Sequence, residues 1–145
     1  MVSQEAYCEN TSVSSGVFCY DGIMKLYLSH ASGYDYKSEL YEPLKRSVAT
    51  EHEILFPHDE HENGVISREV IPTCDAVLAE VSYASTGQGI ELGWADASEV
   101  PIICFFRAGS KVSSALTFVS NRLIEYEAKE DMIEKLRAEI EDLSH

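Results

Sequence analysis

Short, nearly continuous apolar segments alternate with segments of helical periodicity through most of this chain. Three of the five predicted strands are almost unbroken apolar runs, a pattern typical of strands covered on both faces of a sheet. The predicted strands are residues 25–29, 53–57, 75–81, 100–106 and 122–127. The predicted helices are residues 36–49, a short helix that begins at Ser67 as its N-cap, residues 89–98 and residues 129–143, with a weaker turn at residues 114–119.

The alternation of strand and helix predicts right-handed crossovers and therefore a parallel sheet with helices on both faces. For five strands we expect a doubly wound α/β fold, flavodoxin-like or Rossmann-like, with strand order 2-1-3-4-5. Ligands bind such sheets in the crevice where the strand order reverses, here between the carboxyl ends of the first and third strands. The loops at residues 29–35 and 85–91 follow these two strands, so we expect them to meet there.

The chain has 145 residues and a formal net charge of −14, which fits one domain and disfavours nucleic-acid polymers and anionic membranes as partners. No apolar stretch approaches the roughly 20 residues of a membrane-spanning helix, and we expect a cytoplasmic protein. The four cysteines form no CxxC pattern and are expected to be reduced thiols, with a bridge between Cys8 and Cys19 as the alternative. Residues 1–23 show no clear period and are interpreted as an N-terminal extension, whereas residues 24–145 form the single α/β domain.

A glycine-spaced segment, Ser-Thr-Gly-Gln-Gly-Ile-Glu, occupies residues 85–91 directly behind the third predicted strand. A turn of this kind presents backbone amides to a ligand, and phosphate-binding versions usually carry Lys, Ser or Thr after the glycines. Here Glu91 stands in the first predicted helical turn, where the helix dipole favours an ionised carboxylate. Such a carboxylate can attack the anomeric carbon of a sugar, although a capping or solvated glutamate is the common alternative at such a position.

Residues 75–95, which contain Ser-x-Gly-x-Gly-x-Glu-Leu-Gly, and residues 101–106 resemble the nucleoside 2-deoxyribosyltransferase superfamily. The similarity spans about residues 25–126 and is nearest to the 2′-deoxynucleoside 5′-monophosphate N-glycosidase branch. By this resemblance Glu91 is the nucleophile, and Tyr27 orients it through a hydrogen bond. The resemblance implies an enzyme that hydrolyses the N-glycosidic bond of a (deoxy)nucleoside 5′-monophosphate through a glycosyl ester on this glutamate.

The same resemblance implies which residues hold the rest of the substrate. They match the loop that binds the 5′-phosphate and a further serine that reaches across a dimer interface: Ser85, Gly87, Gly89 and Ser114. The resemblance therefore also implies a homodimer that acts on a small-molecule nucleotide or nucleoside. No metal or organic cofactor is expected, because the carboxylate and good positioning suffice for this chemistry.

Two departures from the family pattern bear on activity. Ser67 stands where the family usually carries an aspartate that helps the base to leave, and a serine is no carboxylic acid near neutral pH. Asp59, Glu60 or water would then have to supply the proton. The loop after the first strand also lacks the arginine of the nucleotide-cleaving branch, so His30 is a candidate for the positive charge, with an ordinary hydrogen-bonded loop histidine as the alternative.

Other functions are also compatible with the sequence. A nucleoside 2-deoxyribosyltransferase would intercept the same glycosyl ester with a second base, and the serine at position 67 is also compatible with a non-catalytic nucleotide-binding module. His58 and His61 suggest a metal site, but no third ligand is evident, so we predict none. Trp94 is spaced as a core or groove residue of the third predicted helix.

Overall fold

The computed structural model describes residues 22–59 and 66–145 and contains a five-stranded parallel sheet. The strand order β2-β1-β3-β4-β5 confirms the prediction of a doubly wound α/β fold. In the register of the sheet, Tyr27 of β1 stands beside Leu55 of β2 and Val77 of β3. The strands are β1 (Lys25–His30), β2 (Glu53–Leu55), β3 (Ala76–Glu80), β4 (Ile102–Arg107) and β5 (Leu123–Tyr126).

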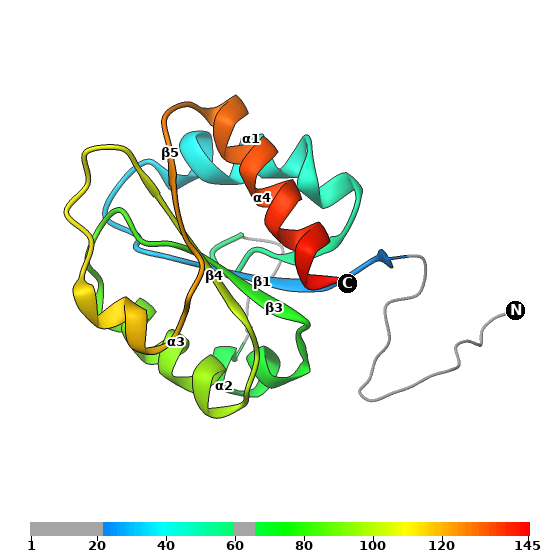
Figure 1. Ribbon diagram of the computed structural model, residues 1–145, viewed down its shortest axis with the longest axis vertical. Coiled ribbons are helices and arrows are strands. Elements are labelled where there is room, and N and C mark those ends of the chain that lie inside the picture. Colours follow the sequence, from blue (N-terminus) through cyan, green and yellow to red (C-terminus); the bar gives the residue numbers. More distant parts are fainter. Residues whose placement is uncertain (1–21, 60–65) are drawn as a thin grey trace, which may run out of the picture.

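Helical segments cover both faces of this sheet (Figure 1). Short segments follow β1 and β2: η2 (Lys37–Tyr41), α1 (Glu42–Lys45), η3 (Val48–Thr50), α2 (Ser67–Val70) and η5 (Ile71–Thr73). Longer helices follow β3 and β5, with a 3₁₀ segment between them: α3 (Thr86–Ala97), η6 (Ser114–Phe118) and α4 (Lys129–Leu143).

Three sequence-based expectations about helices need correction. The predicted helix at residues 36–49 is instead a π-helical turn, one short α-helical turn and a 3₁₀ turn. Ser67 is the first residue of α2 rather than its N-cap, which is Ile66 and makes no side-chain capping bond. Helix α3 begins at Thr86, three residues earlier than expected, because the Ser85 hydroxyl caps it by accepting a hydrogen bond from the backbone.

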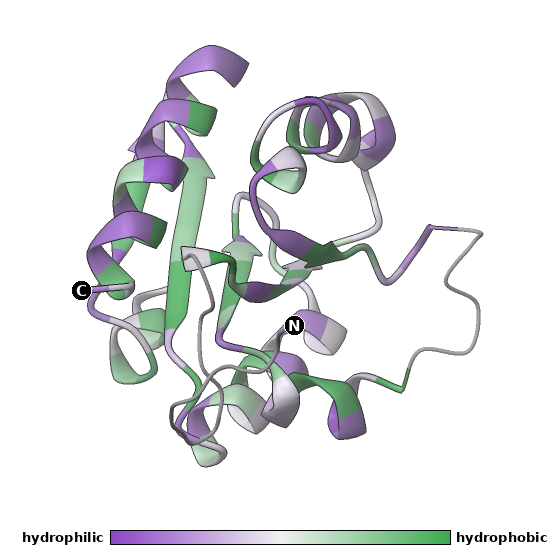
Figure 2. Ribbon diagram, turned by 90° about the vertical axis from the view of Figure 1, so that its right-hand side faces the viewer, coloured by the Kyte–Doolittle hydropathy of each residue, from purple (hydrophilic) through white to green (hydrophobic). Residues whose placement is uncertain are grey.

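Alternate side chains of β1 pack on opposite faces of the sheet. Leu26 and Leu28 belong to the hydrophobic cluster that α1 and α4 cover, whereas Tyr27 belongs to the cluster that α2 and α3 cover. Figure 2 shows that the central strands are largely hydrophobic and that much of α4 is hydrophilic, as expected for a helix that buries one stripe. Tyr27 therefore lies on the α3 side of the sheet.

The structure bears on two further predictions, which concern the cysteines and membrane-spanning helices. Cys74 and Cys104 are free and buried, and burial raises the pKa of each thiol to about 11. Cys8 and Cys19 lie outside the described residues. In the described parts of the chain, none of the helices is long and apolar enough to cross a membrane.

Candidate active site

Three hydroxyl groups converge on the carboxylate of Glu91. Tyr27 Oη donates to Glu91 Oε2 at 2.7 Å and Ser29 Oγ donates to Glu91 Oε1 at 2.7 Å. Ser67 Oγ lies 3.0 Å from Glu91 Oε2 and 2.5 Å from Tyr27 Oη. The carboxylate is thus held by donors from β1 and from the start of α2, while the residue itself stays partly exposed.

The strand period explains why two of these donors come from β1. Tyr27 and Ser29 are two residues apart, so their side chains leave the same face of the sheet. Tyr27 is fully buried, and burial together with the nearby Glu91 raises the pKa of its phenol. The phenol therefore stays protonated at any physiological pH and serves as a donor to the carboxylate.

The position of Glu91 in its helix differs from the sequence-based expectation. It is the sixth residue of α3 and lies beyond the first turn, which contains no acidic residue. The free amides at the helix N-terminus therefore do not reach this carboxylate, and the helix dipole acts mainly within the first turn. The hydroxyls of neighbouring elements provide the stabilisation that the sequence analysis assigned to the helix end.

Two cavities adjoin α3, and they share no lining residue among those described. The smaller one has a volume of about 370 Å³ and is lined by Ile66, Ser67, Arg68, Gly87, Ile90, Glu91 and Trp94. The larger one has a volume of about 960 Å³, and its polar lining includes Ser85, Thr86, Gln88, Lys111, Ser113 and Ser114, with Gly89 beside them. The expected site residues thus fall into two groups, one around Glu91 and one around Ser85 and Ser114.

His30 is engaged within the fold. Its Nδ1 lies 2.8 Å from the carbonyl oxygen of Ala31 and its Nε2 lies 2.8 Å from Tyr41 Oη. Because a carbonyl only accepts, Nδ1 carries the proton and Nε2 accepts from the tyrosine. Burial lowers the pKa of His30 to about 4, so the ring is neutral near pH 7 and provides no positive charge.

The structure describes only some of the candidate proton donors and metal ligands. Asp59 forms an ion pair with Lys45 and lines neither of the two cavities. Glu60 and His61 lie outside the described residues. Within residues 22–59 and 66–145, no cluster of three His, Cys, Asp or Glu side chains could hold a metal ion.

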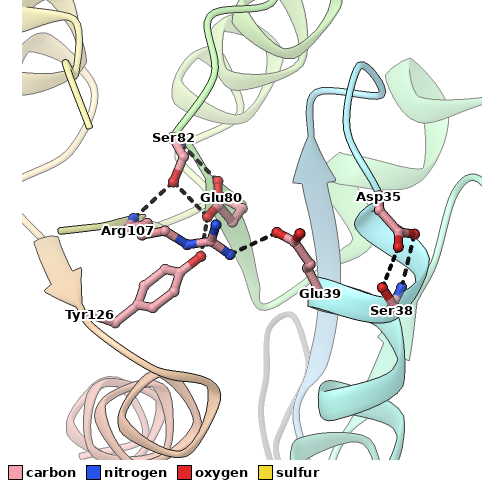
Figure 3. A network of polar contacts seen from close by, with 7 residues as sticks. All are labelled: Asp35, Ser38, Glu39, Glu80, Ser82, Arg107 and Tyr126. Carbon is pink, nitrogen blue, oxygen red and sulfur yellow. Dashed lines mark hydrogen bonds and ion pairs between the residues drawn. The ribbon is translucent and has the colours of Figure 1, made fainter. Parts of the chain in front are cut away.

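A polar network joins the carboxyl ends of β3, β4 and β5 (Figure 3). The buried carboxylate of Glu80 accepts from the Ser82 amide at 2.8 Å, from the Ser82 hydroxyl at 2.7 Å and from the Tyr126 hydroxyl. Arg107 donates its amide to Ser82 Oγ at 2.8 Å and pairs with Glu39 at 2.7 Å. These bonds fix the edge of the sheet from which the loops of the candidate site emerge.

Two candidate site residues, Ser29 and Gln88, were not identified from the sequence. Ser29 could have been found from its two-residue spacing to Tyr27, which places both side chains on one face of a strand. No sequence pattern predicts that Gln88 is buried, since a glutamine between two glycines is typical of an exposed turn. In the structure its side chain is 5% exposed and bonds to two strands.

The fold is shared with solved structures, two of which are named as enzymes. A CMP N-glycosidase from Clostridium botulinum, BcmB, matches with 22% identity and a TM-score of 0.58, over 78% of this chain and 98% of that one. A 2-deoxyribosyltransferase from Bacillus psychrosaccharolyticus matches with 20% identity and a TM-score of 0.53, over 74% and 89%. A conserved protein from Enterococcus faecalis V583 matches with 15% identity and a TM-score of 0.56, over 81% and 99%.

No protein-family model and no curated protein sequence matches this chain. The structural matches nevertheless show that this chain shares its fold with a CMP N-glycosidase and a 2-deoxyribosyltransferase. At these identities the similarity establishes the fold, and any activity has to be argued from the site itself.

Proposed function

We propose that this protein hydrolyses the N-glycosidic bond of a (deoxy)nucleoside 5′-monophosphate through a glycosyl ester on Glu91. The observation that carries the proposal is the carboxylate of Glu91, which three hydroxyls hold beside a cavity. Two proteins that share the fold bear the names of a CMP N-glycosidase and a 2-deoxyribosyltransferase, which supports chemistry at a nucleoside C1′.

The proposed reaction has two displacements at C1′. Glu91 forms a bond to C1′ as the bond to the base nitrogen breaks, and the base leaves with that electron pair and takes up a proton. Water then attacks C1′, the ester bond breaks, and the sugar phosphate and the carboxylate are released. Oε1 accepts one of the hydrogen bonds described above and Oε2 accepts two, which favours Oε1 as the attacking atom.

The first turn of α3 supports a nucleotide as the substrate. Gly87 lines the cavity of Glu91, and Gly89 lines the larger cavity with Ser85, Ser114 and Lys111. A Cβ atom added at either glycine would meet nothing within 4 Å, so packing within the chain does not require glycine there. Glycine in a helix costs about 1 kcal/mol relative to alanine. We infer that the substrate approaches the helix closely at these two positions, with its phosphate toward the serines.

The leaving base must take up a proton, and the described residues offer few donors for it. Ser67 donates a hydrogen bond near Glu91 but cannot replace a carboxylic acid. Asp59 forms an ion pair with Lys45 and does not line the cavity of Glu91, which disfavours it as the donor. Water is therefore the donor that the described residues favour.

The homodimer is likewise part of the proposal. Phe118 of η6 is 85% exposed and lies four residues from Ser114, so a partner subunit would cover an apolar side chain beside the larger cavity. Ser114 already lines this cavity together with Ser85 of its own chain. Light scattering of the parent and of Phe118→Glu tests the homodimer, and a monomeric parent would refute it.

The first test is a substrate panel with a matched pair of variants. Nucleoside 5′-monophosphates in ribo and deoxy forms, and free nucleosides, are incubated with the protein, and free base is measured by chromatography. Glu91→Gln should lower base release more than about 1,000-fold because it removes the nucleophile. Glu130→Gln, an exposed carboxylate on α4, is the control and should behave like the parent.

Each outcome discriminates between the candidate functions. Undiminished turnover by Glu91→Gln would show that Glu91 is not the nucleophile. A parent that binds nucleotides without releasing base would be a binding module. Labelled base recovered as a new nucleotide, when a second base is added, would identify a transferase in place of a hydrolase.

A further inference from the structure

Gln88 is a buried polar residue in the first turn of α3, and its side chain bonds to two neighbouring strands. Its Nε2 donates to the carbonyl oxygen of Ser29 in β1 at 3.1 Å and to the carbonyl oxygen of Glu80 in β3 at 2.8 Å. Both carbonyls lie at or next to the carboxyl ends of their strands. One amide group therefore ties the start of α3 to the two central strands of the sheet.

Ser29 links this tie to the candidate nucleophile. Its carbonyl accepts from Gln88, and its hydroxyl donates to Glu91 Oε1 at 2.7 Å. Gln88 and Glu91 are three residues apart in α3, so they lie on the same side of the helix and face the same strand. The helix is thereby attached to one strand residue at two successive points.

We propose that Gln88 is a positioning residue, which sets the rotation and depth of α3 against β1 so that Glu91 Oε1 stays on the Ser29 hydroxyl. The catalytic consequence of this inference rests on the proposed function, whereas the positional consequence does not. The role needs an uncharged side chain of this length with two N–H donors on one nitrogen, which among the natural residues is glutamine. Asparagine is too short by one methylene, and glutamate offers no donor while it is ionised.

The kinetic test compares Gln88→Met with Gln88→Glu. Methionine keeps the length of the side chain but has no donor, so kcat should fall about 10-fold to 100-fold. KM should change by less than about twofold, since the two N–H groups that methionine removes bond to strand carbonyl oxygens and not to the larger cavity that Gln88 also lines. The carboxyl group of Gln88→Glu, held between two carbonyl oxygens, can donate only when it is protonated. The ratio of its kcat to that of Gln88→Met should therefore rise as the pH falls.

A matched control separates positioning from loss of stability. Val48→Ala removes fully buried volume from the hydrophobic cluster on the opposite face of the sheet and should lower Tm without changing kcat. The positional readout uses the protein without substrate: the carboxyl ¹³C resonance of Glu91 is followed by NMR across a pH titration. In Gln88→Met its midpoint should move relative to the parent, whereas in Val48→Ala it should not.

The outcomes distinguish this inference from the proposed function. A Gln88→Met protein with lowered Tm, unchanged kcat and an unmoved Glu91 titration would reduce Gln88 to a structural role and overturn the inference. A parent that releases no base would refute the proposed function, and the NMR titration would still decide the positioning role. Should Gln88→Met not fold, the Glu91 titration in Gln88→Glu carries the test, because an unmoved midpoint there would also overturn the inference.

Discussion

Removing the phenol oxygen of Tyr27 should slow the proposed reaction without unfolding the protein. Tyr27→Phe keeps the fully buried ring and its packing but deletes the donor that lies 2.7 Å from Glu91 Oε2. A hydrogen bond to a charged group contributes about 1.5–3 kcal/mol. Ser29 and Ser67 still hold the carboxylate, so the free energy of unfolding should fall by no more than about 3 kcal/mol.

The kinetic magnitude follows from the same hydrogen bond. Because 1.36 kcal/mol corresponds to a tenfold change in rate, kcat should fall about 10-fold to 150-fold if the bond orients the attacking group. The effect on KM should be less than about twofold, since the buried phenol does not reach the substrate. Base release at saturating nucleotide measures kcat, and thermal denaturation followed by circular dichroism measures stability. A kcat equal to that of the parent, in a folded Tyr27→Phe protein, would refute the orienting role.

Two further predictions concern pH and the glycines of α3. The pKa of His30 is 6.5 in the unfolded chain and about 4 in the folded one, so the unfolded state binds more protons between these pH values and stability should fall by about 3 kcal/mol as the pH drops from 6.5 to 4. Denaturant unfolding over this range should show a shallower loss for His30→Gln, and an identical loss would contradict the assignment. Gly89→Ala should raise the free energy of unfolding by up to about 1 kcal/mol, because its Cβ meets no atom, yet raise KM for the nucleotide, and an unchanged KM would show that no ligand approaches there.

The sheet was predictable from the sequence because its strands are covered on both faces and therefore read as continuous apolar runs. The strand order followed from the handedness of the crossovers. The helix predicted at residues 36–49, with Pro43 as a kink or restart, is instead a series of short turns, of which α1 begins beside Pro43. The four-residue spacing of Leu40, Leu44 and Val48 is compatible with both arrangements. Hydrophobic period alone does not distinguish one helix from several turns that bury the same side chains.

The predicted start of α3 was wrong for a different reason. Gly87 and Gly89 indicate a loop by their low helix propensity, but both are helical in the structure. The capping hydroxyl of Ser85 and the burial of Gln88 outweigh that propensity. Glu91 consequently lies beyond the first helical turn, where the sequence had placed it. Hydroxyl groups, and not helix amides, stabilise its carboxylate.

One hydrogen bond of the candidate site was predictable, but its full set of contacts was not. The hydrogen bond between Tyr27 and Glu91 was expected from the family resemblance, and the structure contains it. Their roles in catalysis stay predictions. The bond from Ser67 to Glu91 joins residues that are 24 positions apart and depends on how α2 lies beside α3, which no local pattern specifies. The separation of Ser85 from Glu91 into two cavities likewise depends on the three-dimensional path of residues 111–119.

The alternation of side chains along β1 limits how this segment can vary. Tyr27 and Ser29 carry hydroxyls toward α3, while Leu26 and Leu28 pack toward α4. Inserting or deleting a single residue before Tyr27 would exchange the two sets, so that leucines would meet the carboxylate and hydroxyls would enter the opposite core. Homologous chains with the same chemistry can thus differ in residue type along this strand, but their alignment through it should contain no gap.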